Sequence, residues 1–215
     1  TRRGLAKEVS TVLTHVVVDK NDPAFQNPTK PIGTYVSREE ADRLTAERGF
    51  TYAEDAGRGL RRVVPSPQPV SIVELDAIRD LVQTGQVVIA CGGGGIPVVR
   101  TEDGATDGVE AIIDKDFASC RLAQELDADF LVILTAVEKV AIHFGTPQEK
   151  WLDSMTPDEA RIYISEGHFA PGSMLPKVEA ALQFAESGQG RSALITLLEK
   201  AKDGIQGKTG TRIGG

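Results

Sequence analysis

The sequence predicts an α/β fold with a largely parallel sheet that is covered on both faces by helices. Two unbroken apolar runs, at residues 87–91 and 130–135, are typical of strands buried on both faces of a parallel sheet. Segments with helix start signals alternate with such runs, which is typical of a parallel arrangement. The 215 residues suffice for one large α/β domain, or for a domain that carries an insertion.

Residues 19–69 differ from the rest of the chain and are predicted to form a small inserted subdomain. Prolines and polar turn residues are concentrated there, and a capping box at Ser37 predicts a helix to about Arg48. We therefore predict three parts. Residues 1–18, with a strand at 12–18, end the N-terminal part of the main domain. Residues 19–69, with a short strand at 61–64, are inserted, and residues 70–215 form the C-terminal part of the main domain.

The start of this C-terminal part carries two helix signals. Ser71 and Glu74 form a capping box, which predicts a helix to about Thr84 that ends at Gly85. Asp114 is expected to cap a second helix over residues 115–127.

Two more helices are expected in the last third of the chain. One begins at Pro157 behind the capping residue Thr156, and the other begins at Pro176. Strands are expected at 192–197 and, at the edge of the sheet, at 210–213. The last helix is predicted to place four apolar residues on one face: Val178, Ala181, Leu182 and Ala185.

Composition excludes several classes of function. The net charge of −7 and the isoelectric point near 5.1 argue against non-specific binding of nucleic acid or anionic membranes. Cys91 and Cys120 are expected to be small core residues in a reducing compartment, and no histidine clusters with them in sequence as a metal site would require. No apolar run approaches the length of a membrane span and no signal peptide is recognised, so we expect a cytoplasmic protein.

A run of four glycines follows the first apolar strand, in the segment QVVIACGGGGIP. Glycines 92–95 have no side chains to keep a ligand from the backbone, and their amides at a strand end are suited to phosphate. The alternative is a flexible turn. A dinucleotide fingerprint is excluded because Pro97 and Val98 stand where glycine is needed. A Walker A loop at 207–209 is excluded because Lys202 occupies the position of its first glycine. The predicted phosphate- or substrate-binding residues are Gly92, Gly93, Gly94 and Gly95, together with Asp114.

Lys30, Lys115 and Lys177 stand out by their surroundings, although any one lysine is usually a solvated surface charge. A cation in the first turn of a helix opposes the helix dipole, so Lys115 and Lys177 cost stability unless an anion is near. With the glycine run, they indicate phosphoryl transfer, in which catalysis is mostly positioning and charge stabilisation. Asp116 is expected to hold the lysines through ion pairs. Asp114 is expected to orient them or to bind Mg²⁺ through water.

At these residues the sequence closely resembles carbamate kinase, a family of the amino-acid kinase superfamily. The matching stretches are DPAFQNPTKPIG (22–33), EDAGRG (54–59), RRVVPSPQPVSIVE (61–74), GQVVIACGGGGIPV (85–98), VEAIIDKDFAS (109–119), ADFLVILTAV (128–137) and HFAPGSMLPKVEAA (168–181).

The resemblance implies an αβα sandwich with a protruding lid subdomain, a homodimer, and reversible transfer of the phosphoryl group of carbamoyl phosphate to ADP with Mg²⁺. It implies that Lys115 and Lys177 contact the transferred group, that Asp116 organises them, and that Lys30 sits on the lid. No residue is directly assigned as a metal ligand. The nucleotide is expected near Thr135, Ala136, Val137, Lys139, Ser173 and Met174.

The chain departs from the family pattern at its beginning. Carbamate kinases begin with a strand ending in Gly-Gly-Asn and have a second glycine pair further on; neither is found here. About one hundred residues of the family pattern are therefore expected to be absent. This leaves two alternatives open: a nucleotide-binding module of the same fold that does not turn over, and a kinase that acts on another carboxylate such as N-acetylglutamate. The second would not need the proline-flanked segment around Lys30.

Overall fold

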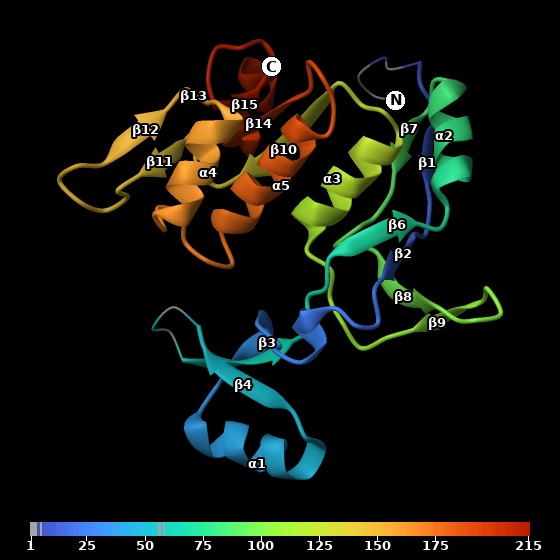
Figure 1. The fold of residues 1–215 in the computed structure, drawn as a ribbon, viewed down its shortest axis with the longest axis vertical. Coiled ribbons are helices and arrows are strands. Elements are labelled where there is room, and N and C mark those ends of the chain that lie inside the picture. The colour runs from blue at the N-terminus through green and yellow to red at the C-terminus, as the bar shows by residue number, and fades with distance from the viewer. Residues whose placement is uncertain (1–3, 5, 56, 58) are drawn as a thin grey trace. The chain divides into compact units, whose positions relative to one another are not determined.

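The computed structural model describes residues 4, 6–55, 57 and 59–215. Positions 1–3 and 5 of the predicted N-terminal part, and positions 56 and 58 of the predicted insertion, lie outside the described residues. The chain divides into two compact units, Thr1–Lys115 and Asp116–Gly215. This division falls inside the predicted C-terminal part, so the first unit holds the predicted insertion together with the glycine run (Figure 1).

The body of the first unit contains two small sheets and one helix. Strands β1 and β7 pair in parallel, and α2 packs against β7. The second sheet has the order β6-β2-β8-β9, in which β2 and β8 are parallel and the outer pairs are antiparallel. The elements are β1 (Val9–Thr11), β2 (His15–Val18), β6 (Pro69–Ile72), α2 (Leu75–Gln83), β7 (Val87–Ile89), β8 (Ile96–Arg100) and β9 (Thr106–Gly108).

Three predictions for this body were wrong. The strand expected at 12–18 is broken, because residues 12–14 connect β1 to β2. The strand expected at 87–91 ends at Ile89 and is not buried on both faces: Val87 and Ile89 are about half exposed, and Val88 is only partly buried. Ser71 does not cap a helix but lies in β6.

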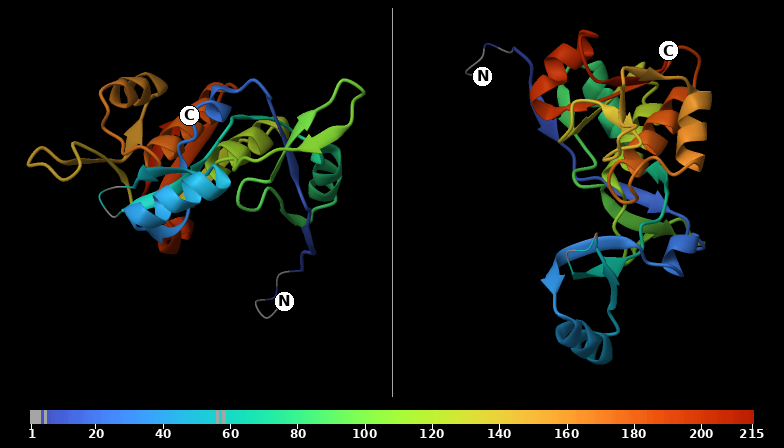
Figure 2. Two further views of the ribbon diagram at one scale, coloured as in Figure 1. Left: turned by 90° about the horizontal axis from the view of Figure 1, so that it is seen from below. Right: turned by 90° about the vertical axis from the view of Figure 1, so that its left-hand side faces the viewer.

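The inserted segment forms its own three-stranded antiparallel sheet, with the order β3-β5-β4, and α1 packs against β4 and β5 (Figure 2). The predicted cap is confirmed, since the Ser37 hydroxyl accepts a hydrogen bond from the Glu40 amide at 3.2 Å. The Asp22 carboxylate accepts hydrogen bonds from the amides of Ala24 and Gln68, which ties together the two connections to this subdomain. Its elements are β3 (Lys30–Val36), α1 (Arg38–Arg48), β4 (Thr51–Glu54) and β5 (Leu60–Val64), preceded by a 3-10 turn at Pro23–Phe25.

The second unit is built on a four-stranded sheet with the order β10-β14-β15-β13, beside a separate hairpin of β11 and β12. Strand β10 is parallel to β14, and β15 is antiparallel to β14. Its elements are α3 (Lys115–Glu125), β10 (Phe130–Thr135), β11 (Val140–Ile142), β12 (Lys150–Leu152), β13 (Ser154–Met155), α4 (Pro157–Ser165), α5 (Leu175–Glu186), β14 (Ser192–Leu197), a 3-10 turn (Leu198–Lys200), α6 (Ala201–Ile205) and β15 (Thr211–Gly214).

Helix α5 lies at the centre of this unit's core. The four residues predicted to share its apolar face are all buried, and so are Ala180 and Phe184. Small side chains on this face allow close packing against the sheet: a Cβ built on Gly214 of β15 would lie 2.7 Å from the Cβ of Ala185. The capping box at Thr156 is also confirmed, with reciprocal hydrogen bonds to Glu159.

Two expectations for the sheets need correction. The strand predicted at the edge, near residues 210–213, lies between β14 and β13, because β15 pairs with both of them. The mixed α/β class is confirmed, but the strands of the described residues fall into five small sheets rather than one clear central parallel sheet. None of the described helices is both long and apolar enough to cross a membrane.

Candidate functional site

The glycine run forms the connection between β7 and β8, and two of its residues are required to be glycine by their surroundings. Gly94 has φ +136°, and a Cβ there would lie 2.1 Å from the carbonyl oxygen of Ile113. Gly95 has φ +82°, and a Cβ there would lie 2.4 Å from Val16 Cγ2. Both contacts are closer than real Cβ atoms tolerate, so these two glycines are needed for packing within the first unit.

The other two glycines have open space around their α-carbons. A Cβ on Gly92 or Gly93 would meet no atom within 4 Å, and only Gly92 of the two has a positive φ. The Gly94 amide donates to the Cys91 carbonyl at 2.6 Å. Among the described residues, the amides of Gly92 and Gly93 donate to no protein acceptor. The run therefore offers backbone donors to a ligand at its beginning.

Lys30 and Asp114 form an ion pair in the first unit, with Nζ and Oδ2 2.5 Å apart. Lys30 is the first residue of β3, so this pair joins the inserted subdomain to the segment that leads into α3. The Asp114 side chain is about one tenth exposed and that of Lys30 about one quarter. Sequence reasoning singled out both residues and expected Asp114 to cap α3 and to orient the lysines or bind Mg²⁺ through water.

Arg61 of β5 supports the strand that carries Lys30. The pairing of β3 with β5 shifts register between Ile32 and Val36. At this irregularity the Arg61 guanidinium donates to the carbonyl oxygens of Gly33 and Pro31, at 3.1 and 3.5 Å, and to the Asp55 carboxylate at 3.1 Å. A planar guanidinium with five donors can hold several acceptors at once, so it replaces strand hydrogen bonds that the irregularity removes.

Lys177 and Asp116 form an ion pair in the second unit, at 2.7 Å between Nζ and Oδ2. Asp116 is the second residue of α3 and Lys177 the third of α5, so both lie in first helical turns. The carboxylate is favoured there by the helix dipole and offsets the unfavourable position of the ammonium group. The ion pair expected between Asp116 and a lysine is present with Lys177. Lys115 precedes it as the exposed first residue of α3.

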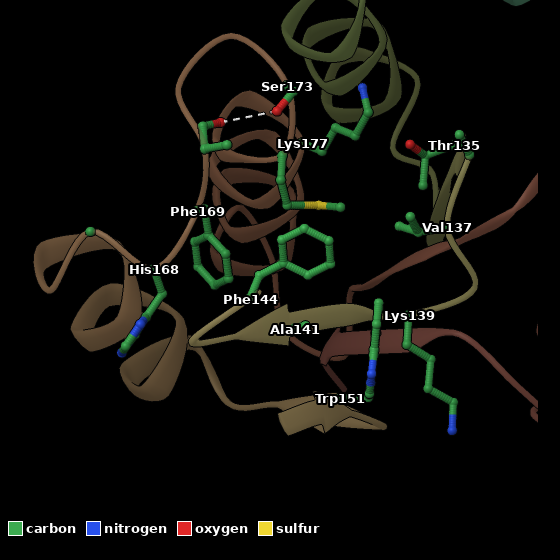
Figure 3. A pocket seen from close by; sticks show the side chains of 14 residues that line it. Thr135, Val137, Lys139, Ala141, Phe144, Trp151, His168, Phe169, Ser173 and Lys177 are labelled. Carbon is green, nitrogen blue, oxygen red and sulfur yellow. Dashed lines mark hydrogen bonds between the residues drawn. The ribbon is translucent and has the colours of Figure 1, made fainter. Parts of the chain in front are cut away.

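A cavity of about 610 Å³ lies in the second unit, next to Lys177 (Figure 3). It lies at the carboxyl end of β10, where ligands of open α/β sheets bind, and beside the N-terminus of α5. All six residues predicted to be near a nucleotide line it. The lining residues are Thr135, Ala136, Val137, Lys139, Ala141, Phe144, Trp151, Gly167, His168, Phe169, Ala170, Ser173, Met174 and Lys177.

The two ends of this cavity differ in character. Lys177 and Thr135 lie at one end, and Trp151 and Lys139 lie at the other (Figure 3). Lys139 Nζ pairs with Asp153 at 2.5 Å, and this hydrogen bond raises the pKa of Lys139. The cavity thus has a cationic end at a helix N-terminus and an aromatic end, which suits a ligand with an anionic and a flat apolar part.

Sequence reasoning missed the aromatic residues of this cavity. Phe144 is about two thirds exposed and Trp151 slightly less than half, and their rings meet edge to face, with ring centroids 6.0 Å apart. The ring of His168 is 4.3 Å from that of His143, although the two are 25 positions apart in the printed sequence. The available signal was the single tryptophan of the chain, which lies within a polar segment.

A model described as the amino acid kinase family matches residues 32–196. The chain belongs to the amino acid kinase family. It is 61% identical to the carbamate kinase-like protein YqeA of Escherichia coli (strain K12), over 98% of this chain and 67% of that protein. It is 55% identical to the carbamate kinase of Clostridium perfringens (strain 13 / Type A), over 99% of this chain and 67% of that protein.

Solved structures of the family agree with this membership. The carbamate kinase from Giardia lamblia bound to AMP-PNP is 43% identical, with a TM-score of 0.86 over 99% of this chain and 67% of that chain. A protein from Aeropyrum pernix K1 is 47% identical, with a TM-score of 0.90 over 99% of this chain and 68% of that chain. This member of the amino acid kinase family therefore spans about two thirds of the relatives that it matches.

Proposed function

We propose that the chain catalyses the reversible transfer of the phosphoryl group of carbamoyl phosphate to ADP, giving carbamate and ATP. The observation that carries this proposal is the cavity beside the Lys177–Asp116 ion pair, whose wall contains every residue predicted to be near the nucleotide. The identity to carbamate kinases, at 52–55% over nearly the whole chain, supports the choice of substrate.

The nucleotide lies in the second unit with its base at the aromatic end of the cavity and its phosphates at the N-terminus of α5. Trp151 and Phe144 offer flat apolar surface to a base. The positive end of a helix dipole favours phosphate, and Ser173 and Met174 lie just before the first residue of α5. AMP-PNP in the Giardia lamblia relative supports a nucleotide ligand.

The lysines stabilise negative charge on the transferred phosphoryl group. Carbamate is already an oxyanion, so the reaction needs no general base, and charge stabilisation with positioning is what the protein must supply. Lys177 serves this role from α5, and Asp116 holds its ammonium group in place. Lys115 serves it from the start of α3. The amides of Gly92 and Gly93, with the rest of the run, contribute donors to the phosphate of carbamoyl phosphate.

Lys30 acts from the inserted subdomain, which serves as a lid over the substrate. In the structure Asp114 holds its ammonium group at 2.5 Å, at the junction between this subdomain and the segment leading into α3. A carbamoyl phosphate dianion competes with this carboxylate for Lys30, so Asp114 keeps the lysine near its working position between turnovers. Lids of this kind exclude water and complete the set of catalytic groups.

Mg²⁺ is proposed to enter with the nucleotide. The described residues contain no group of three His, Cys, Asp or Glu side chains that could hold a metal ion, and both Asp114 and Asp116 already bind lysines. Mg²⁺ usually keeps several waters and is held by substrate phosphates with one or two carboxylates. When bound, it would neutralise phosphate charge, while the lysines and the glycine run would bind and orient the substrates.

Three further parts of the proposal come from the resemblance. The sheets of the two units would belong to one αβα sandwich, as the TM-scores to the solved relatives support. The protein would be a cytoplasmic homodimer. Sedimentation at several concentrations would measure its mass in solution, and a monomer at all concentrations would contradict the dimer.

The second candidate function is nucleotide binding without turnover. One observation favours it: the cavity is formed by residues 135–177 alone, whereas Lys30 and the glycine run belong to the other compact unit. Binding therefore needs fewer of the named residues than catalysis does. A kinase of another carboxylate, such as N-acetylglutamate, shares the same cavity and differs only in its acceptor.

The test measures ATP formation from ADP with two phosphoryl donors, together with calorimetric titration of ADP. ATP from carbamoyl phosphate but not from N-acetylglutamyl phosphate is the expected result. ATP from N-acetylglutamyl phosphate alone would change the substrate. Binding of ADP without ATP from either donor would favour the module that does not turn over.

A further inference from the structure

Thr14 lies beside both ends of the glycine run. It belongs to the connection between β1 and β2, and its side chain is almost completely buried, at 3% exposure. The glycine run is the corresponding connection between β7 and β8, the parallel partners of those two strands. Both connections therefore lead from one strand pair, β1 with β7, to the other, β2 with β8.

The strand pairing before and after the glycine run shows why the run must form a loop. Thr11 pairs with Ile89 before the connections, and His15 pairs with Ile96 after them. The chain thus advances four positions on the Thr14 side and seven on the glycine side. The three additional residues have no partner along the strands, so they form a loop. The strand pairing on either side fixes the distance between the two ends of this loop.

Thr14 forms hydrogen bonds with both ends of this loop. Its hydroxyl accepts a hydrogen bond from the Cys91 amide at 2.9 Å, directly before the first glycine. Its carbonyl oxygen accepts one from the Ile96 amide at 2.9 Å, directly after the last glycine. The same hydroxyl donates to the Val12 carbonyl at 2.9 Å, which fixes its orientation.

The side chain of Thr14 also meets a strained part of the backbone. Cys91, whose amide it binds, has φ +60°, a left-handed conformation that is uncommon for residues other than glycine. Conformations of this kind persist when their surroundings hold them, and the buried hydroxyl is one such restraint. Without it, Cys91 is free to relax, and the amides of Gly92 and Gly93 would move with it.

We propose that Thr14 is a positioning residue for the glycine loop, and that its hydroxyl sets where the loop's free amides meet the phosphoryl group of the substrate. Thr14 does not itself touch the substrate. The proposal rests on the proposed function for its consequence in catalysis, but its structural part concerns the loop alone.

The experiment compares the full chain with Thr14→Val, which keeps the shape but removes the hydroxyl, and with Thr14→Ser, which keeps the hydroxyl. Thr14→Ala replaces Thr14→Val if the methyl group against the Cys91 amide prevents folding. Hydrogen exchange of the loop amides and the separate KM values for carbamoyl phosphate and ADP are measured in each variant. A melting curve gives the folded fraction.

For Thr14→Val we expect faster exchange of the Cys91 and Gly94 amides and a fall of about 10- to 100-fold in kcat/KM for carbamoyl phosphate, as for a small misplacement of reacting groups. The KM for ADP stays unchanged, and Thr14→Ser restores both properties. Unchanged exchange with an unchanged KM for carbamoyl phosphate would overturn the proposal. Equal losses toward both substrates without rescue by serine would overturn it too, because they indicate a merely structural role.

A wild-type chain that forms no ATP from carbamoyl phosphate would contradict the proposed function but not yet the role of Thr14. Inorganic phosphate then serves as the probe, and its binding is titrated with wild type and Thr14→Val while loop exchange is compared. Loss of phosphate binding with faster exchange in the variant supports the positioning role. Equal binding, or no binding by either protein together with equal exchange, overturns it.

Discussion

The Lys177 ammonium group donates to the Asp116 carboxylate at 2.7 Å, with only 13% and 7% of the two side chains exposed. A pair so withdrawn from water is stable only while both partners are present, because a single buried charge is costly. The pair stands at the cationic end of the cavity in the second unit. Asp116 thus holds the Lys177 ammonium group where an anionic ligand in the cavity can contact it.

Replacing Lys177 by alanine should reduce kcat by about 100-fold or more, because a charge contact to the transition state is removed. ADP affinity should change little, since the aromatic end of the cavity remains. The free energy of unfolding should fall by about 3 kcal/mol, because Asp116 is left buried without its partner. Turnover, ADP titration and chemical denaturation measure the three effects.

A double variant separates catalysis from stability at this pair. Lys177→Met with Asp116→Leu removes both charges, so it should recover much of the lost stability while activity stays low. Lys208→Ala is the matched control, since Lys208 is an exposed lysine of the same unit away from the cavity. Near-normal turnover in Lys177→Ala or in the double variant would refute the assigned role.

Replacing Lys30 by alanine should lower turnover by about 100-fold while the protein still folds. The melting temperature should fall by only a few degrees, because the buried Asp114 carboxylate loses this ion-pair partner but Lys30 itself is partly exposed. Arg43→Ala on α1 is the control within the same subdomain. Arg43 pairs only with exposed Glu40 and Glu47 in the described structure, so its loss should leave turnover intact. A sharp fall in melting temperature with normal activity per folded molecule would make Lys30 structural.

The structure changes which glycine gives the clean test of phosphate binding. Gly94→Val should destabilise the protein by about 3 kcal/mol or more, because its Cβ would overlap the Ile113 carbonyl, and this happens whether or not phosphate binds. Gly93→Ala has open space and an ordinary φ, so it should fold normally. If the loop contacts phosphate, the alanine methyl group should weaken carbamoyl phosphate binding by about tenfold in calorimetry. Wild-type affinity in Gly93→Ala would remove the loop from the binding site.

Burial raises the pKa of the Cys120 thiol to about 12. The folded chain therefore keeps the neutral thiol where the unfolded chain, with a pKa of about 8.5, releases the proton. The stability that this group contributes is fully present below about pH 8.5 and is lost as the pH rises toward the folded pKa, by up to about 1.4 kcal/mol per pH unit. Cys120→Ala should make the decline of stability above about pH 8.5 shallower in denaturation experiments. An identical decline in both proteins would contradict the raised pKa.

The local sequence pattern predicted helices and strands well where one apolar face of the element packs against the core. The apolar spacing on α5 predicted its buried face, and the strands at 130–135 and 192–197 were found at the expected residues. The expectation that the strand at 130–135 is buried on both faces was wrong, because only Leu131 and Ile133 of β10 are buried. The six residues predicted to be near a nucleotide converge in one cavity because a strand end and a helix start meet there. For those residues the family resemblance, rather than spacing, supplied the prediction.

The local sequence pattern gave a wrong prediction where a residue distant in the sequence forms the hydrogen bond that was expected locally. Glu74 was expected to complete a capping box with Ser71. Instead its carboxylate accepts hydrogen bonds at 2.7 Å from both the backbone amide and the ring nitrogen of His15, 59 positions earlier in the chain. Two charge-assisted hydrogen bonds outweigh one local cap. No window along the sequence contains both residues.

Short strands were the other source of error. The hairpin of β11 and β12 has three-residue strands, and neither shows enough apolar alternation to be recognised. Its position is set by tertiary contacts such as the buried Thr211 hydroxyl, which accepts from the Val140 amide at 2.8 Å and donates to the Leu152 carbonyl. Because Trp151 lies on this hairpin, the aromatic end of the cavity was missed with it.

ATP formation from ADP and carbamoyl phosphate, measured by luminescence with the full chain and with its Lys177→Ala variant at equal folded concentration, tests the central claim most directly. The account predicts ATP formation that depends on both substrates and falls by about 100-fold in the variant. No ATP from a wild-type chain that binds ADP, or an equal rate in wild type and variant, would contradict it.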